Sequence, residues 1–194
     1  MAKEITYERN LEFLIENGLI EPMIKADLLT KRLNSLQISE QDEILKTIKE
    51  LLGSVGKNPS ISAGFHCDLG YNIHVGNNFY AGYNCVMLDY AEIKIGDNCL
   101  IGPNVGIYTT GHNLDPEERY KTGFAEPIKI GNNVWIGGNA CIMPGVKIGD
   151  NSVIGAGSVV TKDIPAGVVA AGNPCKVIRK ITEKDKVGFT KKKS

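Results

Sequence analysis

The sequence has no excess of charge of either sign. Its 194 residues include 22 basic and 22 acidic side chains, so the formal net charge is zero. Domains that bind nucleic acid usually carry a basic excess or a basic stripe, and we therefore expect no nucleic-acid partner. The only basic run is Lys191–Lys193, which lies in a tail that we place at 183–194 and interpret as solvated.

Long apolar runs are also missing. A helix that spans a bilayer needs about 18 or more consecutive apolar residues, and no run in the chain comes near that length. The first ten residues, MAKEITYERN, lack the apolar region of a secretory signal. We expect no membrane partner and a cytoplasmic location.

The cysteines lack the spacing of a disulfide framework or of a zinc site. They are odd in number and contain no C-x-x-C pair: Cys67, Cys85, Cys99, Cys141 and Cys175. This pattern predicts small buried thiols in a reducing compartment.

Histidines are few, and their spacing does not favour a metal site. The chain has three, of which His66 and His74 stand eight residues apart, at different phases of the six-residue repeat described next. Two rings placed in this way do not converge on one zinc ion, so we expect no metal. The chain also lacks a nucleophile elbow, a Walker loop and a dinucleotide-binding fingerprint.

The dominant feature that is present is a six-residue repeat, which begins near Ile61. Gly often follows the repeated apolar residue and Asn or Asp occupies the turns, as in "IGDNCLIGPN" and "IGNNVWIGGN". Helices repeat about every 3.6 residues and strands every two, whereas a period of six is typical of a hexapeptide β-helix. We predict a mainly β protein, a left-handed parallel β-helix of hexapeptide repeats. The repeated positions are Leu69, Val75, Ala81 and Met87; Ile95, Ile101 and Ile107; and Ile130, Ile136, Ile142, Ile148, Ile154 and Val160.

The rest of the chain divides around this repeat. Residues 1–55 show helical spacing, for example Ile44, Ile48 and Leu51, and predict an N-terminal α-helical cap. The β-helix is expected at 56–182, with a slip of two residues between Met87 and Ile95 and an excursion loop at about 111–127. Stacked triangular coils leave flat sides, which favours a homotrimer.

The excursion begins beside a histidine. The stretch "IYTTGHNLDPEERYKTGFAEPIKIG" interrupts the repeat, and His112 stands at its root. Loops that leave a rigid scaffold often carry sites, and a neutral imidazole there can act as a general base. A surface histidine without a role is the alternative that the pattern alone leaves open.

Several segments resemble the maltose/galactoside O-acetyltransferase family of hexapeptide-repeat acyltransferases. The resemblance covers about residues 5–182 and is carried by "NFYAGYNCVMLDYAEIKIGDNCLIGPNVGIYTTGHNLD" and, most specifically, "IGAGSVVTKDIP" and "AGNPCKVIRKI". It implies an acetyl-CoA-dependent enzyme without a metal, trimeric, with each active site between subunits. It also implies that His112 takes a proton from a sugar hydroxyl that attacks the thioester, and that the backbone N–H of Gly138 stabilises the oxyanion.

The same resemblance assigns the substrate contacts. Acceptor-binding positions fall on Asp68, Tyr80, Asn84, Asp89 and Trp135. For Trp135 simple packing remains an alternative, and for the two acids turn formation does. Coenzyme-binding positions fall on Gly138, Ala156, Thr161, Lys162, Lys176 and Arg179. Cations suit the coenzyme phosphates, although Lys162 and Arg179 taken singly could be surface residues.

The sequence departs from the family pattern at two acceptor positions. The family usually has Asn where Gly82 stands, and Met23 lies near an Arg position. The acceptor is therefore left open between a sugar hydroxyl and an amine or non-sugar group. A trimeric β-helix without catalytic activity is a further alternative. The loop acids Asp115, Glu117, Glu118 and Glu126 receive no role.

Overall fold

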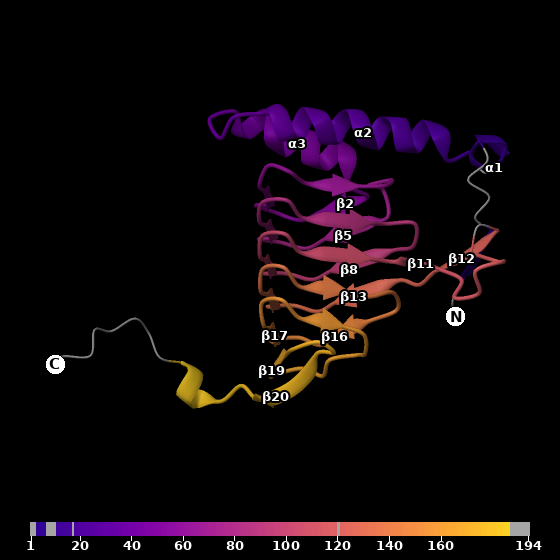
Figure 1. Cartoon of the computed structure of the whole chain (residues 1–194). Coiled ribbons are helices and arrows are strands. Elements are labelled where there is room, and N and C mark those ends of the chain that lie inside the picture. The colour runs from indigo at the N-terminus through magenta and orange to yellow at the C-terminus, as the bar shows by residue number, and fades with distance from the viewer. Residues whose placement is uncertain (1–2, 7–10, 17, 120, 187–194) are drawn as a thin grey trace.

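The computed structural model describes residues 3–6, 11–16, 18–119 and 121–186. Short strands stack as the coils of a prism, with helices across one end (Figure 1). The coil strands pair in parallel with the coil above and the coil below, in three sheets that form three faces. The predicted parallel β-helix is confirmed.

The chain passes through the three faces in turn. The first face consists of β2 (Ser54–Val55), β5 (Ile73–Val75), β8 (Ile93–Ile95), β13 (Ile128–Ile130) and β16 (Lys147–Ile148). The second consists of β3 (Ser60–Ile61), β6 (Tyr80–Ala81), β9 (Leu100–Ile101), β14 (Trp135–Ile136), β17 (Val153–Ile154) and β19 (Val168–Ala171), to which β20 (Lys176–Lys180) adds antiparallel. The third consists of β4 (His66–Cys67), β7 (Val86–Leu88), β10 (Gly106–Tyr108), β15 (Cys141–Ile142) and β18 (Val159–Val160).

The repeated apolar residues fill the prism. Ile136 pairs with Ile154, and Ile142 with Val160, and all four side chains are fully buried. One coil could not cover these side chains alone, so stability comes from stacking. At the turns, residues such as Asn98, Asn133 and Asn151 adopt positive φ, which Asn tolerates better than most residues.

The first coils are longer than the later ones. Met87 pairs with Ile107, 20 residues on, whereas Ile130 pairs with Ile148, 18 residues on. The two extra residues fall where the slip was predicted, between Met87 and Ile95, and also one coil earlier. There the inward residue that pairs with Met87 is Cys67. The assignment of Leu69 to that position was wrong, because Leu69 lies in the enlarged corner.

Two edges of the prism carry the candidate site. The excursion edge, between the third and first faces, consists of residues 68–72, 89–92, 109–127, 143–146 and 161–163. The Asn84 edge, between the second and third faces, consists of residues 62–65, 82–85, 102–105, 137–140 and 155–158.

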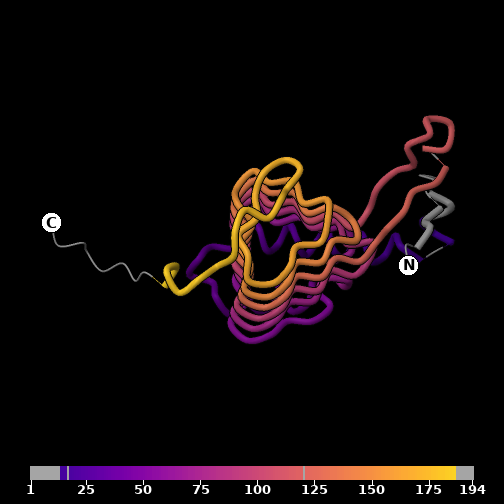
Figure 2. Tube along the Cα trace, turned by 90° about the horizontal axis from the view of Figure 1, so that it is seen from below, coloured from indigo at the N-terminus to yellow at the C-terminus, as the bar shows by residue number. Residues whose placement is uncertain are grey.

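The excursion is a hairpin. Ile95 pairs with Ile130, 35 residues on, which is 17 more than the regular 18. The strands β11 (Thr110–His112) and β12 (Thr122–Ala125) pair antiparallel and form an arm that leaves the prism (Figure 2). The strand β1 (Lys3–Thr6) completes a three-stranded sheet with them. The helical prediction for the N-terminal segment missed this strand.

The cap consists of α1 (Leu11–Glu16), α2 (Ile20–Ser35) and α3 (Gln41–Leu51). Ala26 and Leu33 of α2 and Ile48 of α3 are buried, since the two helices cover the open end of the first coil. The side-chain Oδ1 of Asn34 accepts hydrogen bonds from the N–H groups of Gly64 and Phe65.

The other end of the chain carries the short 3-10 helix η1 (Glu183–Asp185). The lysine run Lys191–Lys193 lies outside the described residues. All five cysteines are free thiols. In the described part of the chain no helix is long and apolar enough to span a bilayer.

Candidate active site

His112 stands at the last residue of β11, where the hairpin leaves the regular coil. Its backbone pairs with Gly123 of β12, and its side chain is exposed. The ring Nδ1 lies 3.3 Å from the carbonyl oxygen of Arg119. Because a carbonyl oxygen only accepts, Nδ1 carries a proton, and in the neutral imidazole Nε2 then carries the lone pair. The imidazole is thus held in the tautomer that a base acting through Nε2 needs.

Arg119 holds the loop that provides this carbonyl. Its Nε donates to the carbonyl oxygen of Asn113 at 3.2 Å, and its Nη2 donates to that of Leu114 at 2.8 Å. The side chain therefore ties the two ends of the loop together behind His112. Sequence reasoning missed Arg119, since a cation in an acidic loop gives no signal of such a role.

The loop acids mainly stabilise the loop. Asp115 accepts the backbone N–H of Glu117 at 2.9 Å, and Glu118 pairs with Lys121 at 2.9 Å. Glu126 lies at the neck, where its N–H donates to the carbonyl oxygen of Thr109 at 2.8 Å.

The two predicted acceptor acids lie on the excursion edge and differ sharply. Asp89 is 0% exposed. Its carboxylate accepts the N–H groups of Asp68 (3.1 Å), Leu69 (2.8 Å) and Asn72 (3.3 Å). A carboxylate that is used in this way fixes the shape of the enlarged corner, which is the turn-forming alternative.

Asp68 has the opposite character. It is half-buried, and its carboxylate makes no hydrogen bond or ion pair with the described residues. Burial, followed by the nearby charge of Asp89, raises the pKa of Asp68 to about 6. A partly desolvated acid without a partner on an accessible edge is a typical functional group.

The corners of this edge are linked along the prism. Thr109, at the root of the excursion, donates through Oγ1 to the carbonyl oxygen of Leu88 and accepts from the N–H of Ala91. Asp89 then joins this corner to the corner of Asp68. From the cap, Met23 accepts the hydroxyl of Tyr90 at 3.9 Å. At the cap end of this edge, Met23 therefore contributes a neutral thioether rather than a charged group.

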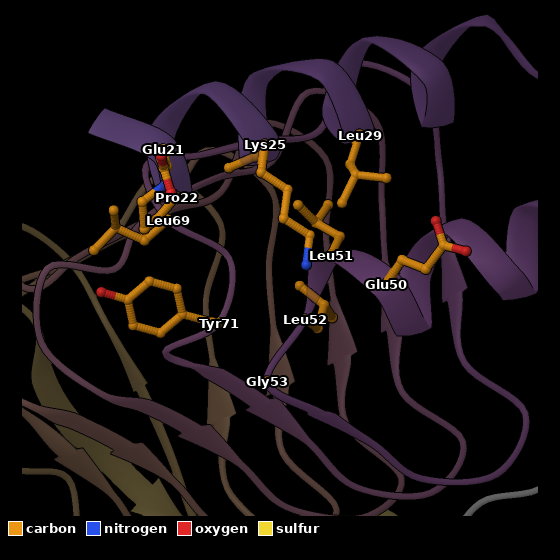
Figure 3. Close-up of a pocket in the computed structure, with 11 residues that line it drawn as sticks. Glu21, Pro22, Lys25, Leu29, Glu50, Leu51, Leu52, Gly53, Leu69 and Tyr71 are labelled. Carbon is orange, nitrogen blue, oxygen red and sulfur yellow. The ribbon is translucent and has the colours of Figure 1, made fainter. Parts of the chain in front are cut away.

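A cavity of about 620 Å³ adjoins this edge beneath α2. Figure 3 shows Leu69 and Tyr71 of the first corner facing Leu51 and Leu52, with Lys25 reaching down from the helix. Its walls are mainly aliphatic, and its volume is in the range of small-molecule sites.

The predicted aromatic residues lie on the second face. Tyr80 pairs with Leu100, which pairs with Trp135, so the three side chains form one outward column. Tyr80 is 37% exposed and Trp135 is 54% exposed. Trp135 therefore does not pack in the core of this chain, although a large apolar surface remains available to a ligand or to a second copy.

Gly138 and Ala156 occupy equivalent turns of the Asn84 edge, one coil apart. Neither backbone N–H donates to any of the described residues, although the neighbouring Asn139 and Gly157 both donate to the coil above. A fixed N–H that the fold does not use is available to a ligand. Asn84, on the same edge, adopts positive φ and its amide donates to Asn104 at 3.2 Å, which is a turn role.

The remaining coenzyme positions lie further from the cap. Thr161 and Lys162 are exposed on the excursion edge, and Lys176 and Arg179 are exposed on β20. The guanidinium of Arg179 is paired with Asp185 at 2.8 Å. Within one chain the site residues thus divide between two edges, with His112 and Asp68 on one and Gly138 and Ala156 on the other. The third face separates the two groups.

The other two histidines join neither group. His74, on the first face, contacts Ser54 through Nδ1 at 2.9 Å and Glu92 through Nε2 at 3.8 Å. The nearby N–H groups of Gly53 and Gly56 donate to carbonyl oxygens of the coil below. They are therefore not available to stabilise an oxyanion beside His74, Ser54 and Glu92. Among the described residues no group of His, Cys, Asp and Glu could hold a metal ion.

Comparisons with known proteins identify the hexapeptide repeat and the family of the chain. A family model described as bacterial transferase hexapeptide (six repeats) matches residues 127–162, and one described as hexapeptide repeat of succinyl-transferase matches residues 92–111. The galactoside O-acetyltransferase of Escherichia coli K12 is 49% identical over 171 residues, which cover 87% of this chain and 84% of that protein.

Solved structures extend the likeness to three dimensions. The maltose O-acetyltransferase from Clostridium difficile 630 has a TM-score of 0.85 at 48% identity, covering 88% of this chain and 91% of that one. A galactoside acetyltransferase in complex with coenzyme A has a TM-score of 0.86 at 46% identity, covering 90% and 88%. Identity and coverage at this level include the cap and the excursion as well as the repeat. The chain therefore belongs to the maltose/galactoside O-acetyltransferase family of hexapeptide-repeat acyltransferases.

Proposed function

We propose that this protein moves the acetyl group of acetyl-CoA to a hydroxyl of a sugar, with His112 as the general base. The observation that carries the proposal is the Nδ1 contact of His112 with the Arg119 carbonyl, because it leaves the lone pair on Nε2. The family relatives, including one solved with coenzyme A, support the donor.

The reaction needs no covalent enzyme intermediate. Nε2 of His112 takes the hydroxyl proton as the sugar oxygen attacks the thioester carbon. The carbonyl oxygen gains negative charge, and the unused N–H of Gly138 donates to it. The intermediate then expels the thiolate of CoA, which takes the proton from the imidazolium. An O-acetyl ester and free CoA result, and no metal has a role.

The site is completed between neighbouring copies. His112 and Gly138 lie on different edges of one prism, so we propose a homotrimer in which the excursion edge of one copy faces the Asn84 edge of the next. The exposed column of Tyr80, Leu100 and Trp135 supports this assembly, because it offers an apolar surface beside the Asn84 edge.

Asp68 is the acceptor residue that the contacts favour. Its unpartnered carboxylate can accept hydrogen bonds from sugar hydroxyls, whereas Asp89 holds the corner in shape. The cavity beneath α2 leaves room for the rest of the acceptor. We propose that Trp135 and Tyr80 line the acceptor site, and that Asn84 borders it from the Asn84 edge.

The coenzyme is proposed to extend along the Asn84 edge. The free N–H groups of Gly138 and Ala156 suit the amide-bearing arm, and the cations suit its phosphates. The phosphate-side residues are Lys176 and Arg179 of the same copy, together with Thr161 and Lys162 from the excursion edge of the neighbouring copy. The free thiols agree with the reducing cytoplasm that we propose as the location.

Thiol release from acetyl-CoA, measured with hydroxyl and amine acceptors, tests the proposal. We expect release with sugars, and we expect His112→Ala to lower kcat by about 10²- to 10⁴-fold with the Kd for CoA nearly unchanged. Release with amines alone would favour amine acetylation. The absence of thiol release with every acceptor would favour a β-helix without catalytic activity. A normal kcat in His112→Ala would remove the base from the mechanism.

A further inference from the structure

The guanidinium of Arg179, on β20, is held by the carboxylate of Asp185. Nη1 donates to Oδ2 of Asp185 and Nη2 donates to Oδ1, each at 2.8 Å. Nη1 also donates to the carbonyl oxygen of Lys180 at 3.1 Å. A two-point fork of this kind fixes the plane of the guanidinium as well as its position.

The fork leaves one edge of the guanidinium unused. Arginine has five N–H donors in fixed directions, and the contacts to Asp185 and Lys180 use three of them. The remaining two, on Nε and Nη2, point to the same side, and no described residue accepts from them. Two parallel N–H groups match two oxygens of a phosphate.

Asp185 is itself fixed, so it can orient Arg179. Its Oδ2 accepts the backbone N–H of Thr182 at 2.8 Å and the hydroxyl of Thr182 at 3.3 Å, in the capping box of η1. The bonds from Arg179 and Thr182 lower the pKa of Asp185 to about 2, so the carboxylate is ionised at any physiological pH.

The position of Arg179 relates it to the reacting end of the site. Trp135 pairs with Val153, Val153 with Val169, and Val169 with Arg179. These three steps place Arg179 about 14 Å along the second face from Trp135, at about 4.8 Å per strand. Gly138 stands three residues after Trp135, so the guanidinium lies one extended arm away from the proposed oxyanion donor.

We propose that Asp185 is a positioning residue that locks Arg179 so that its free edge binds a phosphate of the coenzyme. The inference rests on the proposed function, since it takes the coenzyme to extend from Gly138 along the Asn84 edge, which borders the second face. It assigns a role to the segment that follows β20, which sequence reasoning treated as part of a solvated tail. The phosphate is either the 3′-phosphate or the pyrophosphate, and the experiment separates the two.

The test compares Asp185→Asn with Glu183→Gln. Both substitutions remove one carboxylate charge from η1, but Glu183 pairs with Lys186 and not with Arg179. The readouts are the Kd of CoA and of 3′-dephospho-CoA by calorimetry, and the KM and kcat for acetyl-CoA. We expect Asp185→Asn to raise the Kd of CoA and the KM about 5- to 10-fold, with kcat nearly unchanged, and Glu183→Gln to change neither.

The measurements with 3′-dephospho-CoA identify the phosphate that Arg179 binds. If Asp185→Asn leaves the Kd of 3′-dephospho-CoA unchanged, Arg179 binds the 3′-phosphate. If that Kd rises as much as the Kd of CoA, Arg179 binds the pyrophosphate. In an Arg179→Ala background Asp185→Asn should have no further effect.

Three results would overturn the proposal. The first is a Kd for CoA that Asp185→Asn leaves unchanged or lowers. A lower Kd would mean that the carboxylate of Asp185 competes with the phosphate for Arg179. The second is an effect that persists in Arg179→Ala. The third is a wild-type protein that binds no CoA. A wild type that binds CoA but releases no thiol would refute the acetyl transfer alone.

Discussion

Replacing Asp68 by Asn should stabilise the fold at neutral pH while weakening the acceptor site. The pKa of this acid rises from 3.8 to about 6, first because of burial and second because of Asp89. At 1.36 kcal/mol per pKa unit, the ionised form would be disfavoured by about 3 kcal/mol. Solvent still reaches the carboxylate, which reduces the expected value to about 1–2 kcal/mol.

The sign of the pH dependence follows from the direction of the shift. An acid whose pKa is raised by folding binds its proton more tightly in the folded state. The folded state therefore loses stability as the pH rises from about 4 to about 6, and the loss is complete above that window. Asn carries no charge at either pH, so Asp68→Asn should match the wild type near pH 4 and exceed it at pH 7.5.

Urea unfolding at pH 4 and pH 7.5, at fixed protein concentration, measures this difference. Asp89→Asn is the matched control, because it lies on the same edge but places an amide nitrogen against the N–H of Asn72. It should lower the free energy of unfolding by about 1–3 kcal/mol. A fall in stability of Asp68→Asn at pH 7.5 would refute the reasoning, since it would mean that Asp68 serves the turn. The KM for the acceptor should rise in Asp68→Asn.

Two further substitutions test the catalytic geometry. Arg119→Ala removes the bonds that hold the loop behind His112, so kcat should fall about 10-fold or more with the KM for acetyl-CoA little changed; a loss confined to KM would contradict the positioning role. Gly138→Pro removes the proposed oxyanion donor and should lower kcat about 10²- to 10³-fold. Pro103 occupies the equivalent turn one coil above, so the coil does not need the N–H. Gly138→Ala keeps the N–H and should retain most activity, and it also measures the effect of a Cβ that would lie 3.0 Å from the carbonyl oxygen of Pro103.

The repeat could be predicted from sequence because it is local and redundant. Each inward Ile or Val stacks on an equivalent residue about one coil away, so one misassigned residue does not change the fold. Leu69 shows the limit of this rule. It continues the six-residue spacing toward Val75, yet the chain enlarges the corner and uses Cys67 instead, and spacing alone does not distinguish the two.

The site was predicted less completely than the fold. His112 is proposed from the sequence because it stands where the repeat stops, and Gly138 because of the family motif. The pattern did not separate Asp68 from Asp89, since both are acids in turns. Their roles differ only through their neighbours: Asp89 receives three N–H groups and Asp68 receives none. Contacts between separate coils decide this, and a sequence does not list them.

The supporting residues were the hardest to foresee. Arg119 and Asp185 act on His112 and Arg179 through loops that have no period, so neither belongs to a pattern. β1 was missed for a related reason, because its partner β12 lies more than 100 residues away in the chain. This short strand does not belong to the six-residue repeat, so the repeat does not predict its pairing.

The regularity of the coil also explains why one N–H can become a catalytic donor. Pro103, Gly138 and Ala156 are equivalent turn residues, since Ile101, Ile136 and Ile154 pair in register. Proline at the first of them has no N–H, so the ladder does not need that group at this turn position. The N–H groups of Gly138 and Ala156 are therefore available without any loss of coil hydrogen bonds. Gly138 stands two residues after the strand of Trp135, and we therefore assign its N–H, rather than that of Ala156, to the reacting carbonyl. A Cβ at position 138 would lie 3.0 Å from the carbonyl oxygen of Pro103, so Gly138→Pro should keep the coil after a small shift of this turn and lose mainly kcat.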